Sequence, residues 1–318
     1  MDLYGEKNGG HRLRIGLFGQ SGPFAPMALR ELLGPSAGSA GVDWEVVLVV
    51  EGRRKPMGRS NHRWQMPVTI RKSMGSLPRT QGLAELALAA GIPVFQTCDV
   101  NSVKALRELS KIPFDLLICV GFDCLFKQEV LHLPARGAWN CHPSFLPELR
   151  GPAPIFWALK RGDTSIGVSI HQLDLREDNG PLLHQGAISL QAMDTGSQIF
   201  ERVGKWVGRE LQKVLAQELL GQLRAVPQGQ PDGPRATRVK PEDVFVEPRN
   251  WSCGHLVRFA CGAPYFRAPW LRMGEDTYYI RRGIEAVPGR KIPAQYALVG
   301  SELFVGCVDG VARLEIQT

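Results

Sequence analysis

Residues 139–154 (WNCHPSFLPELRGPAP) contain residue types that can act together on a carbonyl group. Asn140 and His142 lie two residues apart at the end of an apolar run typical of a buried strand, so we expect both side chains on one face. An amide can donate a hydrogen bond to a developing oxyanion, and an imidazole can hold or move a proton near neutral pH. Downstream, residues 174–180 form an acidic loop from which a carboxylate could orient the imidazole.

Each of these residues also has a structural interpretation. An asparagine at a strand end often forms a turn, a single histidine is often structural, and Asp178 could cap a turn before Gly180. From pattern alone the sequence therefore indicates an α/β enzyme without fixing its reaction.

The elements that position these residues alternate between apolar strands and helices. This alternation predicts an α/β fold, a mostly parallel twisted sheet with helices on both faces, whose ligands bind beyond the carboxyl ends of the strands. We expect strands at 13–19, 44–50, 94–95, 114–120, 137–140, 166–173 and 182–190, and helices at 24–33, 82–88, 102–109, 125–131 and 197–220.

A change in composition marks a second domain. Residues 225–241 (AVPQGQPDGPRATRVKP) are rich in proline and glycine and read as a linker. Beyond them, short strands at 277–281, 296–298, 303–307 and 312–316 predict a small β-barrel or sandwich. The predicted domains are 1–224, the linker 225–241, and 242–318.

Composition indicates the protein class. The chain has 318 residues and is 44% hydrophobic, which suffices for a large core without disulfides. Its seven cysteines are odd in number and lack zinc-type paired spacings, so we expect neither a disulfide framework nor a metal site. No run reaches the length of a membrane span and the first residues lack the apolar stretch of a signal peptide, so we expect a cytoplasmic protein with no membrane partner.

The positive charge is concentrated in one segment. The net charge is +7, and between positions 53 and 80 there is no acidic residue. Such a segment often contacts phosphate, although a solvated loop that only aids solubility is an equal alternative. Its eight basic residues are Arg53, Arg54, Lys55, Arg59, Arg63, Arg71, Lys72 and Arg79.

The central segment resembles the signature of the folate-dependent formyltransferases, N-x-H-x-S-x-L-P-x-x-R-G-x-x-P, which here begins at Asn140 and ends at Pro154. Residues 162–164, 167–170 and 174–180 continue the resemblance, which covers nearly the whole chain. The layout is similar to that of the methionyl-tRNA formyltransferases. It implies a Rossmann-like catalytic domain, a linker and an OB-like C-terminal β-barrel.

The resemblance also implies a reaction and a site. Its catalytic set falls on Asn140, His142 and Asp178, its donor is 10-formyltetrahydrofolate, and a primary amine attacks the formyl carbon. Asn140 and a protonated His142 would stabilise the oxyanion, and Asp178 would hold the imidazole. The implied folate-binding residues are Cys119, Val120, Gly121, Phe122, Asp123, Ser144 and Asp174.

Two departures from the family pattern affect these expectations. The acidic loop has the sequence Asp178-Asn179-Gly180-Pro181 where the family commonly has Asp-x-Gly-Asp. The resemblance therefore does not fix the geometry of the pterin-binding loop. Glu148-Leu149 stands where tRNA-acting members often have Arg-Trp, which weakens the assignment of the acceptor.

Four hypotheses about the function remain open, three of which differ in the acceptor. The first is methionyl-tRNA, because a basic insertion approaches the acceptor stem in tRNA-acting relatives and Trp64 could stack on a base. The others are a nucleotide-linked amino sugar, water in a hydrolysis reaction, and a catalytically idle RNA- or folate-binding relative. The residues expected to bind the acceptor are Arg53, Arg54, Lys55, Arg59, Arg63 and Arg150.

Overall fold

The computed structural model describes residues 12–34, 43–54, 61–67, 82–230, 233–292 and 294–317. It divides into two compact units. The first unit contains the described residues up to His142, with Ser169–His184 and Gly204–Gln228. The second contains Pro143–Val168, Gln185–Val203 and the described residues from Gly229 onward. The expected domain boundaries near residues 224 and 242 stay predictions.

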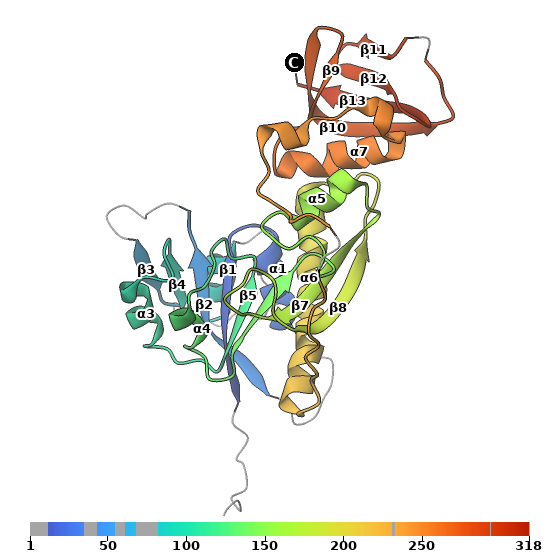
Figure 1. Cartoon of the computed structure of the whole chain (residues 1–318). Coiled ribbons are helices and arrows are strands. Elements are labelled where there is room, and N and C mark those ends of the chain that lie inside the picture. Colours follow the sequence, from blue (N-terminus) through green and yellow to red (C-terminus); the bar gives the residue numbers. More distant parts are fainter. Residues whose placement is uncertain are drawn as a thin grey trace, which may run out of the picture. The chain divides into compact units, whose positions relative to one another are not determined.

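An eight-stranded sheet runs in the order β3-β4-β2-β1-β5-β6-β7-β8 (Figure 1). The pairs β1–β2, β1–β5, β2–β4 and β5–β6 are parallel, whereas β3–β4 and β6–β7 are antiparallel. The prediction of a mostly parallel sheet is confirmed. The strands are β1 (Leu13–Gln20), β2 (Trp44–Gly52), β3 (His62–Gln65), β4 (Val94–Thr97), β5 (Leu116–Val120), β6 (Ala138–His142), β7 (Ser165–Gln172) and β8 (Leu182–Ser189).

Helices join these strands and flank the sheet. They are α1 (Phe24–Leu32), α2 (Leu83–Ala89), α3 (Val103–Leu109), α4 (Gln128–Leu131), α5 (Pro154–Arg161) and α6 (Gly196–Leu219). The long helix expected at 197–220 is confirmed as α6, whereas the expected helix at 125–131 is confined to the single turn of α4.

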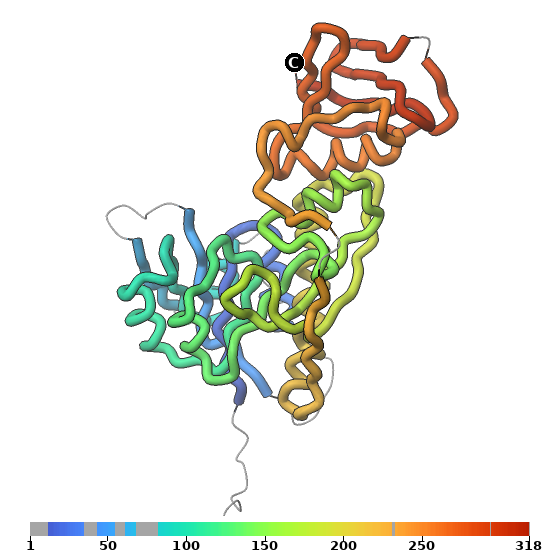
Figure 2. Tube along the Cα trace, in the orientation of Figure 1, coloured from blue at the N-terminus to red at the C-terminus, as the bar shows by residue number. Residues whose placement is uncertain are grey.

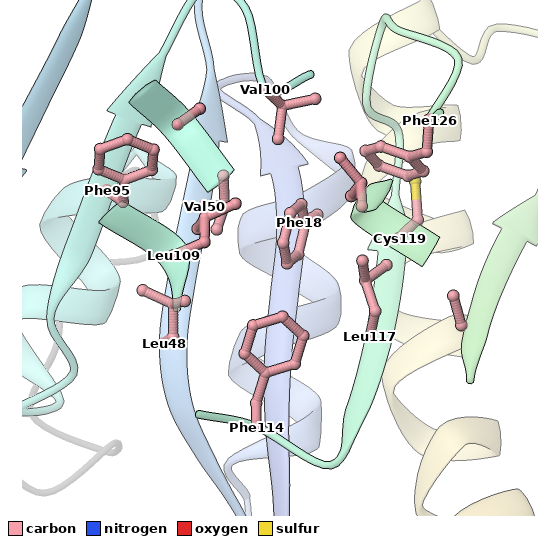
Figure 3. Close-up of a cluster of buried hydrophobic side chains, with 13 residues drawn as sticks. Phe18, Leu48, Val50, Phe95, Val100, Leu109, Phe114, Leu117, Cys119 and Phe126 are labelled. Atoms are coloured by element: carbon pink, nitrogen blue, oxygen red, sulfur yellow. The ribbon is translucent and has the colours of Figure 1, made fainter. Parts of the chain in front are cut away.

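One face of the sheet in the first unit carries an apolar core around Phe18 of β1 (Figure 3). Leu48 of β2 and Leu117 of β5 lie on either side of it, and helices α3 and α4 supply further apolar side chains, among them Leu109. Because successive strand residues alternate faces, the neighbouring Gly19 faces the other layer. A Cβ at Gly19 would lie 2.6 Å from Ala25 of α1 and 3.1 Å from Leu83 of α2.

Helix α6 packs closely on α1 through two glycines. A Cβ at Gly204 would lie 2.5 Å from the backbone oxygen of Phe24, and one at Gly208 would lie 2.5 Å from that of Ala28. Small residues here let the two helices approach until backbone meets backbone. The sheet of the first unit is thereby covered on both faces, as predicted.

The C-terminal part forms a five-stranded antiparallel sheet in the order β11-β12-β13-β10-β9, which confirms the expected OB-like domain. Helix α7 (Cys253–Gly262) packs on β10, where a Cβ at Gly283 would lie 2.6 Å from the oxygen of Val257. Within the same unit α7 also lies beside α5, as the green and orange segments show (Figure 2). The strands are β9 (Trp270–Met273), β10 (Asp276–Pro288), β11 (Tyr296–Val299), β12 (Glu302–Gly306) and β13 (Gly310–Ile316).

Short 3-10 turns precede and follow α7, at Pro241–Val244, Pro248–Asn250 and Ala263–Tyr265. In the part of the chain that the structure describes, no helix combines the length and apolar character needed to cross a membrane.

Candidate active site

Strand β6 presents Asn140 and His142 near its carboxyl end, two residues apart and therefore on the same face. Asn140 is partly buried, and His142 is only 5% exposed. The apolar Trp139 and Cys141 alternate with them and are buried. The position of this pair agrees with the sequence-based expectation.

The acidic loop after β7 brings Asp178 to the same place. The backbone of Asp178 is left-handed, with a φ of +49°. Gln228 donates through its side-chain amide to the backbone oxygens of Asp178 (3.0 Å) and Gly180 (2.7 Å). A Cβ at Gly180 would lie only 2.0 Å from the backbone oxygen of Gln172, so glycine is required for this close approach. The loop is therefore held against the end of β7 in one conformation.

The three side chains converge around the carboxylate of Asp178. Asn140 donates from Nδ2 to Asp178 Oδ1 at 3.1 Å, and His142 Nδ1 lies 3.5 Å from Asp178 Oδ2. Asp178 is 9% exposed, so this charge is largely removed from water and interacts more strongly with its neighbours than a surface carboxylate would. An amide, an imidazole and a buried carboxylate in contact form an arrangement suited to proton transfer and oxyanion stabilisation.

A fourth side chain, His171 of β7, was missed in the sequence analysis. Strand pairing places it directly opposite Asn140, and it is fully buried. Its Nε2 lies 3.1 Å from Asn140 Nδ2 and 3.7 Å from Asp178 Oδ1. The sequence shows a histidine inside an apolar strand, but only the antiparallel register of β6 and β7 shows that it faces the site.

The two cysteines beside this group are unsuited to act as nucleophiles. Burial, together with the nearby negative charge of Asp178, raises the pKa of the Cys119 thiol to about 12. Burial also raises the pKa of Cys141 well above its ordinary value. Since the thiolate is the reactive form, both are neutral thiols near neutral pH. The polar chemistry of the site therefore falls to the amide, imidazole and carboxylate groups.

The expected folate loop, residues 119–123, follows β5 next to the catalytic strand. Cys119 is paired with Asn140, and Gly121 turns the chain with a φ of +64°. Phe122 packs so closely on Gly52 that a Cβ there would lie 3.0 Å from its ring. Asp123 forms an ion pair with Arg54 at 3.4 Å.

The other expected site residues occupy two different places. Asp174 lies in the acidic loop, where its Oδ1 accepts from the backbone nitrogen of Arg176 at 2.7 Å. Ser144 and Arg150 belong to the second unit. Ser144 is buried and donates to the backbone oxygen of Glu148 at 2.6 Å, and Arg150 donates to that of Gly229 at 3.4 Å. The segment between them carries the Leu146–Pro147 cis peptide bond.

The basic segment is described only in part. Lys55, Arg59, Arg71, Lys72 and Arg79 lie outside the described residues. Arg53 and Arg54 follow β2, with side chains 46% and 77% exposed, and Arg63 is exposed on the edge strand β3. Trp64 packs on Phe95 with ring centroids 4.9 Å apart and donates to Glu108 at 2.7 Å. Its ring therefore contributes to the packing of the edge strand, and the suggestion that it stacks on a base stays a prediction.

Among the described residues, no group of three or more histidine, cysteine or acidic side chains is arranged to hold a metal ion.

A comparison with protein families decides the assignment. The family model described as "Formyl transferase" matches residues 30–215, more than half of the chain. The chain belongs to the formyl transferase family. The matched segment includes Asn140, His142 and Asp178, so the side chains that converge in the structure lie inside the region shared with the family.

Curated relatives of this formyl transferase include methionyl-tRNA formyltransferases of bacteria. The protein of Acidithiobacillus ferrooxidans (strain ATCC 53993 / BNL-5-31) is 38% identical over 161 residues, 51% of each chain. That of Xanthomonas euvesicatoria pv. vesicatoria (strain 85-10) is 34% identical over 198 residues, 62% of this chain and 59% of the relative. The chain thus spans between half and three fifths of the length of these relatives.

Solved structures share the fold over nearly the whole chain. An N-formyltransferase from Helicobacter canadensis, in complex with folinic acid and dTDP-3-aminofucose, has a TM-score of 0.61 at 12% identity and covers 96% of this chain and 100% of its own. The sugar 3N-formyl transferase WlaRD has a TM-score of 0.62 at 15% identity and covers 96% and 98%. At these identities the likeness supports the fold of the formyl transferase chain and nothing finer.

Proposed function

We propose that this protein transfers a formyl group from 10-formyltetrahydrofolate to a primary amine, and that the amine is that of methionyl-tRNA. The observation that carries the reaction is the contact of Asn140 and His142 with the buried carboxylate of Asp178 in a chain of the formyl transferase family. We place this activity in the cytoplasm, where charged tRNA is used.

His142 is the proposed proton carrier. Its Nδ1 faces Asp178 Oδ2 at 3.5 Å, so the carboxylate can accept a hydrogen bond from Nδ1–H and orient the ring. The Nε2 atom is then the ring nitrogen that exchanges a proton with the reacting groups. The acceptor amine attacks the formyl carbon, a C–N bond forms, and the bond from that carbon to the folate nitrogen breaks. One proton leaves the amine, and His142 delivers it to the departing nitrogen.

Asn140 is proposed to stabilise the negative charge that develops on the formyl oxygen, and His142 adds to this once it has accepted the proton of the amine. Donors that are already oriented in a water-poor site contribute more to such stabilisation than donors in water. The low exposure of His142 and Asp178 provides that environment.

The folate donor fits the carboxyl end of β5. Residues Cys119 to Asp123 follow this strand, and the left-handed Gly121 exposes backbone groups next to the catalytic strand β6. Ligands of parallel sheets commonly bind at such strand ends. We propose that the backbone of this loop and Asp174 hold the donor, which supplies the formyl group.

Two observations favour methionyl-tRNA as the acceptor. The relatives at 32–38% identity are named methionyl-tRNA formyltransferases. In the first unit, Arg53, Arg54 and Arg63 are exposed to a large extent, and arginine binds phosphate well through its planar fork of donors. A nucleotide-linked amino sugar is the second candidate, because the solved structures of similar fold include sugar formyl transferases.

The acceptor is tested by following tetrahydrofolate release from 10-formyltetrahydrofolate with three acceptors in parallel. These are charged initiator methionyl-tRNA, a panel of nucleotide-linked amino sugars, and buffer alone. We expect turnover with the tRNA only. Turnover only with a sugar would keep the mechanism and replace the acceptor, and equal turnover in buffer would show a hydrolase. No turnover in any arm, together with no binding of the folate donor, would overturn the proposal.

A further inference from the structure

His171 interacts with two members of the proposed catalytic group although it lies outside the matching motif. It is fully buried on β7, opposite Asn140. Its Nδ1 lies 2.8 Å from the backbone oxygen of Gln172, and its Nε2 lies 3.1 Å from Asn140 Nδ2. Both ring nitrogens are therefore within hydrogen-bonding distance of a polar partner.

These partners determine where the proton of His171 resides. A carbonyl oxygen can only accept a hydrogen bond, so Nδ1 must carry the proton. The amide of Asn140 must present its nitrogen to Asp178, because two facing oxygens would repel each other. The same nitrogen faces His171 Nε2. That ring nitrogen must therefore be unprotonated, so that its lone pair accepts a hydrogen bond from the Asn140 amide.

This assignment accounts for both hydrogens of the Asn140 amide. One is donated to Asp178 Oδ1 and the other to His171 Nε2, each at 3.1 Å. The two contacts fix the plane of the amide and exclude its flipped orientation. They also divide the Asp178 carboxylate: Oδ1 lies by Asn140 and His171, and Oδ2 lies by His142.

We propose that His171 is a positioning residue that holds the amide of Asn140, and through it the carboxylate of Asp178, in the orientation needed for formyl transfer. The inference rests on the proposed function for its catalytic consequence. The neutral lone pair of His171 is a weaker acceptor than an oxyanion. The developing oxyanion can therefore replace His171 as the acceptor of that Asn140 amide hydrogen. The stronger hydrogen bond from Asn140 to the charged Asp178 keeps the amide in place.

Two substitutions separate this role from simple core packing. His171→Leu keeps an apolar side chain of moderate size and removes the acceptor, whereas His171→Gln retains an acceptor oxygen near the position of Nε2. For His171→Leu we expect kcat to fall roughly 10- to 100-fold, the effect typical of losing an orienting hydrogen bond, with KM for donor and acceptor changed less than about twofold. His171→Gln should recover most of that loss.

The matched control is His132→Leu, the same replacement at an exposed histidine that follows α4. It should leave kcat unchanged. A wild-type kcat for His171→Leu would show that the acceptor is not needed. Equal losses for the leucine and glutamine variants would show that packing alone explains the data. Either result would overturn the proposal.

A spectroscopic measurement tests the geometry independently of turnover and of variant folding. In wild-type protein labelled with ¹⁵N-histidine, we expect His171 to be the neutral tautomer protonated on Nδ1 at neutral pH. A proton on Nε2 would overturn the inference. If the wild-type protein formylates none of the acceptors, the proposed function fails, and the tautomer still decides whether His171 accepts from Asn140.

Discussion

Replacing Asp178 by asparagine removes one negative charge and leaves the local shape nearly unchanged. Asparagine tolerates the left-handed backbone that this residue adopts, with its φ of +49°, better than most residues do. The substitution abolishes the charge that faces His142 Nδ1 at 3.5 Å and weakens the acceptor of the Asn140 hydrogen bond. Its main effect should therefore fall on catalysis and not on folding.

The expected size of the effect follows from the distance between the charges. Two unit charges 3.5 Å apart attract by about 5 kcal/mol at an effective dielectric constant of about 20. The new amide retains some dipole and avoids burying a charge, so we expect about 3–5 kcal/mol of lost transition-state stabilisation. This corresponds to a fall in kcat on the order of 10² to 10⁴.

The assay is release of tetrahydrofolate at saturating donor and acceptor, with far-ultraviolet circular dichroism and a urea titration to establish folding. Glu177→Gln is the matched control, because it makes the same change of carboxylate to amide one residue earlier in the loop, and it should retain kcat. A folded Asp178→Asn protein whose kcat is within about threefold of wild type would refute the electrostatic reasoning, because about 3 kcal/mol requires at least a hundredfold loss.

Three further outcomes are expected. Gly204→Ala gains helix propensity of about 1 kcal/mol but places a Cβ 2.5 Å from the backbone oxygen of Phe24, so the urea midpoint of unfolding should fall. A higher midpoint would contradict the close packing of α1 and α6. Replacing Arg53 and Arg54 together by glutamine should weaken tRNA binding and leave binding of the folate donor unchanged. The slope of log affinity against log salt concentration should become shallower by about 0.7–0.9 per lost phosphate contact. An unchanged slope would exclude phosphate binding by these two arginines. Burial lowers the pKa of His255 below 6.5, so the unfolded state takes up a proton at this histidine before the folded state does as the pH falls. The free energy of unfolding should therefore decrease below pH 6.5 by at most about 1.4 kcal/mol per pH unit. His255→Gln should flatten this dependence, and an identical dependence in the variant would contradict the assignment.

Much of the sheet is predictable because its strands are apolar and buried on both faces. Runs such as β2 and β5 are continuous in Val, Leu and Ile, so their length and composition identify them without knowledge of the fold. The convergence of Asn140 and His142 follows from their spacing of two residues on β6.

Other elements leave no comparable pattern in the sequence. The four residues of β3, HRWQ, are mostly polar and lie in the basic segment, so only their pairing with β4 shows that they form an edge strand. Helix α7 begins at a serine cap but is short, and it packs on β10 from within a region expected to be all strands. His171 depends on the register between β6 and β7, which periodicity within one strand does not specify.

The central claim is that the group formed by Asn140, His142 and Asp178 transfers a formyl group to an amine. The most direct test is to supply 10-formyltetrahydrofolate labelled in its formyl carbon together with methionyl-tRNA, and to identify the labelled product by mass spectrometry. We predict label on the amino nitrogen of methionine with wild-type protein and its near absence with His142→Ala. Label that appears only as formate, or equal transfer by wild type and variant, would contradict the claim.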